Sequence, residues 1–234
     1  MKLISVATTL NRWSKDWEDS AERLGYDFKV LGVGVPWTGF DTKMQVLLDY
    51  ITSSDPDDLI VLTDCYDVIM VGSPEELENK FKAANKSIIM GAERLCSLNC
   101  EKNAAKTCGA TKKNKHVNTG FMMGKAKDLA EAINYANEHG NGDDQLGAGR
   151  FWMAHCDKVH LDSEQEFVAN IYSINELKAV SGKRFMSKQT SNYPVVLHMP
   201  GMYNDLGKRS TIIRSAVLPS HVVASKGYYL KTYI

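Results

Sequence analysis

Short apolar runs alternate with amphipathic segments through the first half of this 234-residue chain. The apolar runs are residues 2–9, 27–33, 58–64 and 87–93. The amphipathic segments are residues 13–25, 41–54 and 73–85. Strands and helices that alternate at this spacing form right-handed βαβ units, with helices on both faces of the sheet. The pattern predicts an α/β fold with a doubly wound, mainly parallel sheet flanked by helices.

The second half is less regular but is compatible with the same fold. Residues 95–115 form a polar loop with little periodicity, and residues 127–140 read as a helix that ends at Gly140. Further strands are expected at residues 116–124, 158–163, 166–172 and 194–201. No internal repeat, linker or low-complexity tract divides the sequence. We therefore expect a single domain over residues 1–234.

The composition is that of an ordinary globular protein, with 44% hydrophobic residues, 24% charged residues and a formal net charge of zero. A neutral chain has no bulk electrostatic attraction to nucleic acid or to an anionic membrane. No apolar run reaches the length of about 18 residues that a membrane span needs. The N-terminus reads as a first strand rather than a secretory signal, and five cysteines are an odd number for a secreted framework. These features favour a cytoplasmic protein.

Two aspartates interrupt the apolar stretch "LIVLTDCYDVIMVGSPEEL" at residues 59–77. Asp64 ends an apolar run and Asp67 follows three residues later. Ligands of open α/β sheets bind beyond the carboxyl ends of the strands, so both carboxylates are expected to face one crevice. Such a pair suits Mg²⁺ or Mn²⁺ bound with a substrate phosphate. Alternatively, Asp64 caps a turn and Asp67 is solvated. A phosphatase-type nucleophile is disfavoured, because its carboxylates are separated by one residue rather than two.

The same stretch resembles the metal-binding strand in the glycosyltransferase domain of procollagen lysyl hydroxylases and related collagen glycosyltransferases. Those domains carry a TDxYDV-type segment followed by a Pro-Glu-Leu helix start. Other motifs agree in order, namely "VPWTGFDTKMQVLLDYI", "AERLC", "NTGFMMGKAKDL", "DDQL" and "VLHMPG". The likeness covers residues 1–205, and nothing resembles the family's dioxygenase part. It implies a stand-alone transferase domain of the GT-A fold, without hydroxylation.

The resemblance implies a metal site. In the family two aspartates and a C-terminal histidine hold Mn²⁺, with Mg²⁺ as the alternative, and the ion bridges the diphosphate of a nucleotide sugar. The matching residues are Asp64, Asp67 and His198. Such an ion neutralises the diphosphate and stabilises the leaving UDP. Apart from the resemblance, a single histidine near a strand end is more often structural than a ligand.

The resemblance also implies a pocket for the nucleotide. Tyr66 matches the residue that stacks on uracil, Trp37 matches a donor-pocket aromatic, and Lys43 matches a lysine near the nucleotide. Thr63 belongs to the TDxYDV-type segment, and Gly201 is expected to let the backbone approach the diphosphate. Apart from the resemblance, Tyr66 would be a core or turn aromatic. Trp37 would cover the core, and Lys43 would lie on a solvated helix face.

A second acidic pair, Asp143 and Asp144, follows helix 127–140. In the family this pair lies over the donor sugar and the acceptor. A carboxylate there acts as a base for the acceptor hydroxyl or stabilises an oxocarbenium-like centre. Asp143 is also placed to be the N-cap of the next helix, so we favour Asp144 for the chemistry. The family's asparagine two residues after the histidine is Pro200 here, so the phosphate contact of that asparagine is not expected.

Loop 95–115 departs from the aromatic, proline-rich loop of the family. It contains Cys96, Cys100 and Cys108, and His116 follows it directly. These residue types are ligands for structural Zn²⁺, but the spacing is not that of a standard zinc knuckle, so a single disulfide or unpaired thiols are favoured. Its five lysines form a solvated surface, a lid over the donor or a face for an acidic acceptor. The lysines are Lys102, Lys106, Lys112, Lys113 and Lys115.

These features predict a metal-dependent glycosyltransferase that moves a hexosyl group from a UDP-sugar to a hydroxyl of a protein or glycan. Two other functions stay open at this point. One is a different metal-dependent enzyme acting on nucleotides, such as a nucleotidyltransferase or a pyrophosphohydrolase. The other is a catalytically silent domain that binds a nucleotide sugar.

Overall fold

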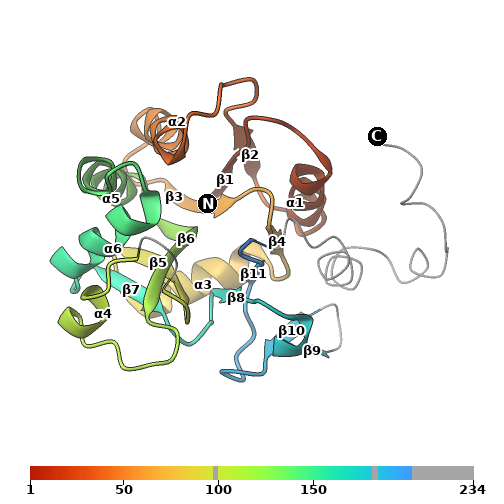
Figure 1. Ribbon diagram of the computed structural model, residues 1–234. Coiled ribbons are helices and arrows are strands. Elements are labelled where there is room, and N and C mark those ends of the chain that lie inside the picture. Colours follow the sequence, from red (N-terminus) through yellow and green to blue (C-terminus); the bar gives the residue numbers. More distant parts are fainter. Residues whose placement is uncertain (97–99, 181–183, 202–234) are drawn as a thin grey trace.

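A six-stranded mixed sheet forms the centre of the molecule in the computed structural model, which describes residues 1–96, 100–180 and 184–201 (Figure 1). The order is β2-β1-β3-β6-β5-β7. The strands are β1 Lys2–Val6, β2 Phe28–Leu31, β3 Leu59–Asp64, β5 Ile88–Glu93, β6 His116–Lys125 and β7 Val159–Asp162. Only β6 runs antiparallel to its neighbours in this sheet. The expected mainly parallel α/β fold is confirmed.

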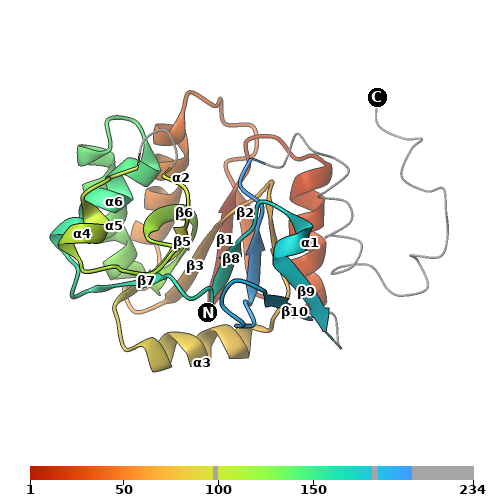
Figure 2. The same ribbon diagram turned by 60° about the horizontal axis from the view of Figure 1, so that its bottom comes forward.

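Helices cover both faces of this sheet. They are α1 Arg12–Arg23, α2 Phe40–Thr52, α3 Pro74–Ala84, α4 Ala104–Thr107, α5 Ala126–His139 and α6 Asp144–Ala154. Apolar residues of α2, α5 and α6 share one core cluster with the sheet, and those of α1 and α3 share another. Figure 2 shows α1 on the other side of the sheet from α2, α5 and α6. The fold is therefore doubly wound.

The hydrophobic pattern explains why the sheet is buried on both faces. Along β3, Ile60 and Leu62 belong to the cluster beneath α2, α5 and α6, whereas Val61 belongs to the cluster beneath α1 and α3. Successive side chains of a strand point to opposite faces, so a strand that is apolar throughout needs cover on both. Trp17 of α1 is fully buried in the second cluster. Burial of each such side chain contributes about 1.5–3 kcal/mol.

A smaller sheet with the order β4-β11-β8 packs beside the central one. Its strands are β4 Val68–Met70, β8 Val168–Asn170 and β11 Val196–His198. A separate antiparallel pair, β9 Leu177–Val180 and β10 Arg184–Ser187, follows the 3₁₀ turn Ile174–Glu176. Strands β4, β9 and β10 were not expected, because runs of three or four residues give little periodic signal. The small sheet matters for the site because β4 follows β3 and pairs with β11.

Two disulfides lie in or near the loop between β5 and β6. One joins Cys96 to Cys100, and the other joins Cys108, at the end of α4, to Cys156, beyond the end of α6. The expectation of a single disulfide or of unpaired thiols is therefore wrong, because the partner of Cys108 lies outside the loop. Since Cys108 is paired, it does not join the other two cysteines and His116 in a four-ligand zinc site.

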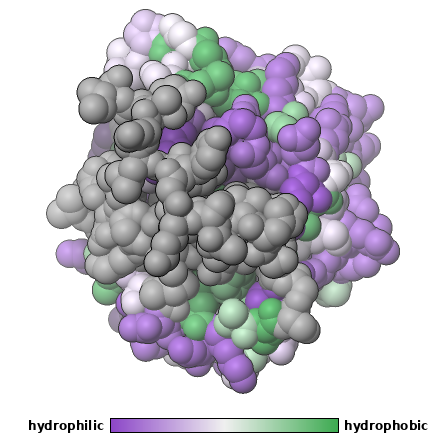
Figure 3. Space-filling model, turned by 90° about the vertical axis from the view of Figure 1, so that its right-hand side faces the viewer, coloured by the Kyte–Doolittle hydropathy of each residue, from purple (hydrophilic) through white to green (hydrophobic). Residues whose placement is uncertain are grey.

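Where the described residues are visible in Figure 3, hydrophobic residues form separate patches among hydrophilic ones. Trp37 and Phe40 are among the exposed large hydrophobic residues, and their rings meet edge to face at 5.9 Å. Among the helices that the structure describes, none combines the length and the hydropathy of a membrane span.

Candidate active site

The carboxyl edge of the central sheet collects most of the predicted site residues. Strands β1, β2, β3 and β5 run in the same direction, so the segments that follow them meet at one edge. Asp64 ends β3, and the turn that carries Tyr66 and Asp67 comes directly after it. Trp37 lies in the loop between β2 and α2. The edge that α/β proteins use for ligands is therefore lined by these predicted residues.

Asp64, Asp67 and His198 come together as a cluster whose candidate ligand atoms all lie within 4.8 Å of one another. Nε2 of His198 is 3.7 Å from Oδ2 of Asp64 and 3.5 Å from Oδ1 of Asp67. The pairing of β4 with β11 brings them together, because Val68 stands opposite His198 and the amide of Met199 donates to the carbonyl of Asp67 at 2.8 Å. Residues from distant parts of the sequence thus share one centre.

The hydrogen bonds of His198 fix which nitrogen faces the carboxylates. Its Nδ1 lies 2.6 Å from Oδ1 of Asn170, and Nδ2 of Asn170 donates to the carbonyl of Ala92 at 2.8 Å. Oδ1 of Asn170 therefore accepts, so Nδ1 of His198 donates and Nε2 carries the lone pair in the neutral ring. Nε2 is buried and makes no hydrogen bond to any described residue. An orphaned nitrogen beside two carboxylates, with an outer amide that orients the ring, fits a divalent cation.

The charge around His198 also favours a cation. Burial disfavours the charged imidazolium, but the carboxylates of Asp67 and Asp64 outweigh it and raise the pKa of His198 above its ordinary value. His198 is 2% exposed and Asp67 is 9% exposed, so water screens this negative field poorly.

Gly120 of β6 provides the space for the His198 ring. A Cβ atom at this position would lie 2.1 Å from Cε1 and 2.4 Å from Nδ1 of His198, closer than any side chain allows. The glycine in "NTGF" is therefore required because the imidazole packs directly on the backbone of β6. This explains why a motif on a central strand belongs to the site.

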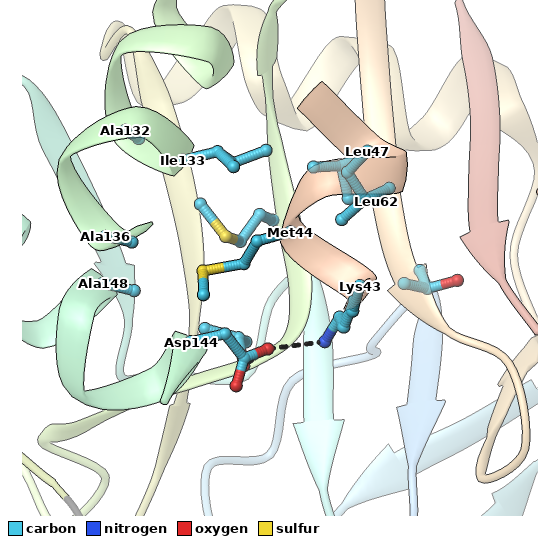
Figure 4. A pocket seen from close by; sticks show the side chains of 12 residues that line it. Lys43, Met44, Leu47, Leu62, Ala132, Ile133, Ala136, Asp144 and Ala148 are labelled. Atoms are coloured by element: carbon cyan, nitrogen blue, oxygen red, sulfur yellow. Dashed lines mark hydrogen bonds and ion pairs between the residues drawn. The ribbon is translucent and has the colours of Figure 1, made fainter. Parts of the chain in front are cut away.

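Lys43, in the first turns of α2, links the cluster of Asp64, Asp67 and His198 to the second acidic pair. Its Nζ lies 2.7 Å from Oδ1 of Asp64. It also lies 2.8 Å from Oδ2 of Asp144, the contact marked in Figure 4. The lysine side chain is 12% exposed. Burial disfavours its charge, but Asp144 and Asp64 outweigh burial and raise its pKa, so the ammonium is charged at neutral pH. Asp64 thus gives one oxygen to Lys43 and directs the other towards His198.

The two aspartates at the start of α6 have different surroundings. Asp143 is the N-cap, and its Oδ1 accepts the amide of Leu146 at 2.8 Å. Asp144 is 7% exposed, and its Oδ2 also accepts the hydroxyl of Thr119 at 3.0 Å. Between Lys43 and Thr119 the Asp144 carboxylate is held in one orientation at the edge of the site. The expected N-cap role of Asp143 is confirmed, and the chemical role expected for Asp144 stays a prediction.

The other predicted site residues differ in how close they come to this centre. The hydroxyl of Tyr66 donates to the carbonyl of Thr9 at 2.8 Å, so its ring stands at the edge of the sheet between the β1 and β3 loops. Thr63 is 4% exposed, and its hydroxyl accepts a hydrogen bond from Nε1 of Trp17 at 2.8 Å, which is a core contact. Trp37 is exposed, and Gly201 follows β11 with a φ of 71°, exposed to solvent.

A small cavity of about 30 Å³ lies beneath the Lys43–Asp144 pair. Figure 4 shows Met44, Leu47 and Ile133 around it, with the Lys43–Asp144 ion pair at one end. A cavity of this size holds water at most, so it is not a binding site for a nucleotide or a sugar.

Sequence reasoning missed the polar residues that hold the site together. Asn170 orients His198, Thr119 binds Asp144, and the buried Glu93 accepts from Nε2 of Gln145 at 2.9 Å. The hydroxyl of Tyr172 also bonds to Glu93. A signal for some of them was present, because Glu93 ends an apolar strand as Asp64 does, and Asn170 interrupts the apolar run "FVANIY".

The sheet with helices on both faces, and an acidic cluster at its carboxyl edge, are the features of a GT-A-type glycosyltransferase. The chain belongs to the family described as the PLOD GT domain, whose model matches residues 1–207. The expected family and the expected enzyme class are confirmed.

Two multidomain proteins illustrate the relationship. Procollagen-lysine,2-oxoglutarate 5-dioxygenase 2 of Mus musculus is 32% identical over 180 residues, which cover 72% of this chain and 23% of that protein. The multifunctional procollagen lysine hydroxylase and glycosyltransferase LH3 of Homo sapiens is 28% identical over 162 residues, 64% of this chain and 22% of that protein. The chain thus corresponds to less than a quarter of the length of these relatives.

A solved structure supports the fold. A glycosyltransferase involved in the glycosylation of the major capsid of PBCV-1 is similar with a TM-score of 0.51 and 11% identity, over 90% of this chain and 98% of that one. At this identity the likeness concerns the architecture alone.

Proposed function

We propose that this glycosyltransferase is metal-dependent and transfers a hexosyl group from a UDP-sugar to a hydroxyl of a protein or glycan. The observation that carries the proposal is the buried Nε2 of His198, which has no hydrogen bond among the described residues and lies beside Asp64 and Asp67. A buried ring nitrogen that lies beside two carboxylates and makes no hydrogen bond is suited to bind a divalent cation. The family supports the choice of reaction, since LH3 carries glycosyltransferase in its name.

Asp64, Asp67 and His198 would hold Mn²⁺ or Mg²⁺. Two carboxylates and one imidazole suit Mn²⁺, which accepts both oxygen and nitrogen ligands. A divalent ion bound there supplies the positive charge that neutralises the diphosphate of the donor. Asn170 keeps the imidazole in the tautomer that ligates.

Lys43 and Asp144 act on the sugar side of the same site. Lys43 holds the Asp64 and Asp144 carboxylates in fixed positions, and its charge offsets part of their repulsion. Thr119 and Lys43 occupy Oδ2 of Asp144. We assign Oδ1 of Asp144 to the substrate, where it accepts a hydrogen bond from a sugar or acceptor hydroxyl or stabilises positive charge at the anomeric carbon.

The nucleotide is placed by aromatic residues of the neighbouring loops. Tyr66 follows Asp64 by two residues, and its hydroxyl is anchored to Thr9, so the ring is held in place at the edge of the sheet. We assign it to stacking on uracil, and Trp37, exposed on the loop before α2, to the same pocket. Gly201, with its positive φ and open surroundings, is the position at which the backbone approaches the diphosphate.

Thermal denaturation with UDP, in the presence and absence of Mn²⁺, tests the proposal. A ligand that binds only the folded state raises the melting temperature, so UDP with Mn²⁺ is expected to stabilise the wild type and to have little effect on Asp67→Asn. Asp57→Asn, at an exposed carboxylate paired with Lys125 and Lys127, is the matched control and should retain the stabilisation. The absence of any Mn²⁺-dependent stabilisation by UDP in the wild type would refute the proposed metal-dependent donor binding.

Hydrolysis of a panel of UDP-sugars then identifies the donor. Asp144→Asn is expected to retain the Mn²⁺-dependent stabilisation by UDP but to lose turnover, because the substitution spares the metal ligands. If UDP-sugars are not turned over while nucleoside triphosphates are, the chain is a nucleotide-handling enzyme instead. Binding without turnover of either would identify a silent binding domain.

A further inference from the structure

The loop that joins β5 to β6 begins and ends at a second cluster of potential metal ligands. A ligand atom from each of Cys96, Cys100 and His116 lies within 4.8 Å of the other two. Sγ of Cys100 is 3.8 Å from Nδ1 of His116. None of the three belongs to the cluster of Asp64, Asp67 and His198, and the proposed glycosyl transfer uses none of them.

We propose that Cys96, Cys100 and His116 form a second metal site, which binds a thiophilic ion such as Zn²⁺ when the Cys96–Cys100 disulfide is reduced. A dithiol reductant supplies two electrons and two protons, so the disulfide becomes two thiols and the reductant becomes a disulfide. Zn²⁺ then replaces the two thiol protons, which pass to the solvent. Water completes a tetrahedral site with two sulfur ligands and one nitrogen ligand.

The residue types and their spacing fit this ion. Cysteines separated by three residues lie within the range that zinc sites use, and soft thiolates select Zn²⁺ over Mg²⁺ or Mn²⁺. The cluster of Asp64, Asp67 and His198 has the opposite preference, because its two carboxylates are hard ligands that suit Mg²⁺ or Mn²⁺.

The β5–β6 ladder contributes to holding these side chains near each other. His116 stands opposite Glu93 in the β5–β6 ladder, and the amide of Lys115 donates to the carbonyl of Glu93 at 3.1 Å. Cys96 is three residues beyond Glu93, so the strand pair also brings the start of the loop close to His116. In the oxidised chain Cys108 is bonded to Cys156, and the Cys108→Ser/Cys156→Ser variant below excludes both thiols from the reduced chain.

An ion at this position would fix the point at which the loop leaves the sheet. Glu93 accepts a hydrogen bond from Gln145, the neighbour of Asp144 in the first turn of α6. The loop is also close to α6 further along, where a Cβ on Gly149 would lie 3.0 Å from Cβ of Glu101. The second metal site would therefore stabilise the loop beside the helix that carries the acidic pair.

Titration of the reduced full-length chain with Co²⁺ tests the proposal. Co²⁺ occupies zinc sites and gives a near-ultraviolet charge-transfer band only when thiolates ligate it, so binding at the carboxylate–histidine cluster does not contribute. We expect a band that saturates at one Co²⁺ per chain and disappears when Zn²⁺ is added. The oxidised protein should give no band.

Variants assign the band to its ligands. Cys96→Ser/Cys100→Ser should abolish it, whereas Cys108→Ser/Cys156→Ser should retain it. His116→Gln should weaken Zn²⁺ affinity on the order of tenfold or more, and His139→Gln, at a half-exposed histidine elsewhere, should not change it. Because Cys96 is exposed, the single variant Cys96→Ser tests the site without disturbing the fold, and its band should be weaker.

The proposal is overturned if no thiolate band forms in the reduced wild type. It is equally overturned if the band is lost in Cys108→Ser/Cys156→Ser, or if His116→Gln binds Zn²⁺ as tightly as the wild type does. The stabilisation by UDP with Mn²⁺ is measured in the same samples. A chain that keeps this stabilisation but gives no band disproves the second site while leaving the proposed function intact.

Discussion

Lys43 and Asp144 form a buried ion pair of 2.8 Å between helices α2 and α6. The same ammonium binds Asp64, so one cation joins the metal cluster to the acidic pair. Replacement by Met leaves two poorly solvated carboxylates without their counter-ion. We expect Lys43→Met to lower the free energy of unfolding by about 3–5 kcal/mol and to abolish turnover. Calorimetric or denaturant unfolding and a UDP-sugar assay measure the two effects.

Arginine is not expected to rescue this position, because its planar, larger head group does not fit between the two carboxylates as a compact ammonium does. Lys127→Met serves as the control, since Lys127 is exposed and pairs with Asp57 at 3.0 Å. Its loss should change stability by no more than about 0.5 kcal/mol. Wild-type turnover in Lys43→Met would contradict the assignment of Lys43 to the site.

Gly120→Ala is expected to disrupt the metal cluster from the opposite side. The added methyl group would overlap the His198 ring, so the imidazole must move away from Asp64 and Asp67. We expect a loss of about 1–3 kcal/mol of stability and loss of the Mn²⁺-dependent stabilisation by UDP. Gly25→Ala is the control, because φ at Gly25 is 77° and no atom would lie within 4 Å of an added Cβ. This variant should lose stability through backbone strain alone and keep the Mn²⁺-dependent stabilisation by UDP.

Tyr66 provides a test of nucleotide stacking. Tyr66→Ala removes the ring and should weaken UDP binding by about 1–3 kcal/mol, the usual value of stacking a base on an aromatic side chain. Tyr66→Phe removes only the hydroxyl that contacts Thr9 and should bind UDP nearly as the wild type does. Isothermal titration of UDP in the presence of Mn²⁺ measures both. Equal affinities of Tyr66→Ala and wild type would place uracil elsewhere.

The buried carboxylate of Asp162 gives a prediction for the pH dependence of stability. Burial raises its pKa from 3.8 to about 7, although the backbone amides of Val168, Glu166 and Phe167 donate to it. Between pH 3.8 and about 7, the Asp162 carboxyl is therefore protonated in the folded protein and ionised in the unfolded chain. The contribution of Asp162 to stability is fully present below about pH 4 and decreases as the pH rises towards 7.

Urea unfolding at a series of pH values checks this prediction. Asp162→Asn cannot titrate, so the decrease assigned to Asp162 should be absent from its curve. In this variant the side-chain NH₂ group would face backbone amides that donate to a carboxylate oxygen in the wild type. Two donors then face each other, so the variant is also expected to be less stable by about 1–3 kcal/mol. Parallel pH profiles for wild type and variant would show that Asp162 does not titrate in this range.

The Cys108–Cys156 disulfide closes a loop of 48 residues. Chain-entropy arguments assign about 4 kcal/mol to a cross-link of this length. We expect Cys108→Ser/Cys156→Ser to be destabilised by this order in oxidising buffer, and the difference to vanish in a thiol reductant that opens the bond in the wild type. A difference that persists after full reduction would assign the loss to packing rather than to the cross-link.

Much of the fold could be predicted because its signals are local. The runs that became β1, β3 and β5 are largely apolar, and α2 places Met44, Leu47 and Ile51 on one face. The antiparallel direction of β6 was not predicted, since strand direction depends on pairing rather than on the strand's own residues. The partner of Cys108 was missed for a similar reason, because it lies 48 residues away.

The sequence predicted the residues that are proposed to bind the ion and the substrate. It predicted less well the residues that hold those side chains in position. The "TDCYD" and "DDQL" motifs pointed to Asp64 and Asp144, but nothing in the sequence indicated that Lys43 bridges them. Asn170 and Thr119 act through single hydrogen bonds to His198 and Asp144. The first contact depends on the pairing of β8 with β11, and the second on the packing of α6 beside β6, and no local pattern encodes either.

The pairing of β4 with β11 places Asp67, which lies early in the chain, beside His198, which lies in the last described strand. During synthesis the aspartates emerge long before the histidine does. The proposed divalent-ion site is therefore incomplete until β11 has joined the small sheet. Tight metal binding would then mark the end of folding, so a truncated or half-translated chain would not hold the ion and would not become a competent enzyme.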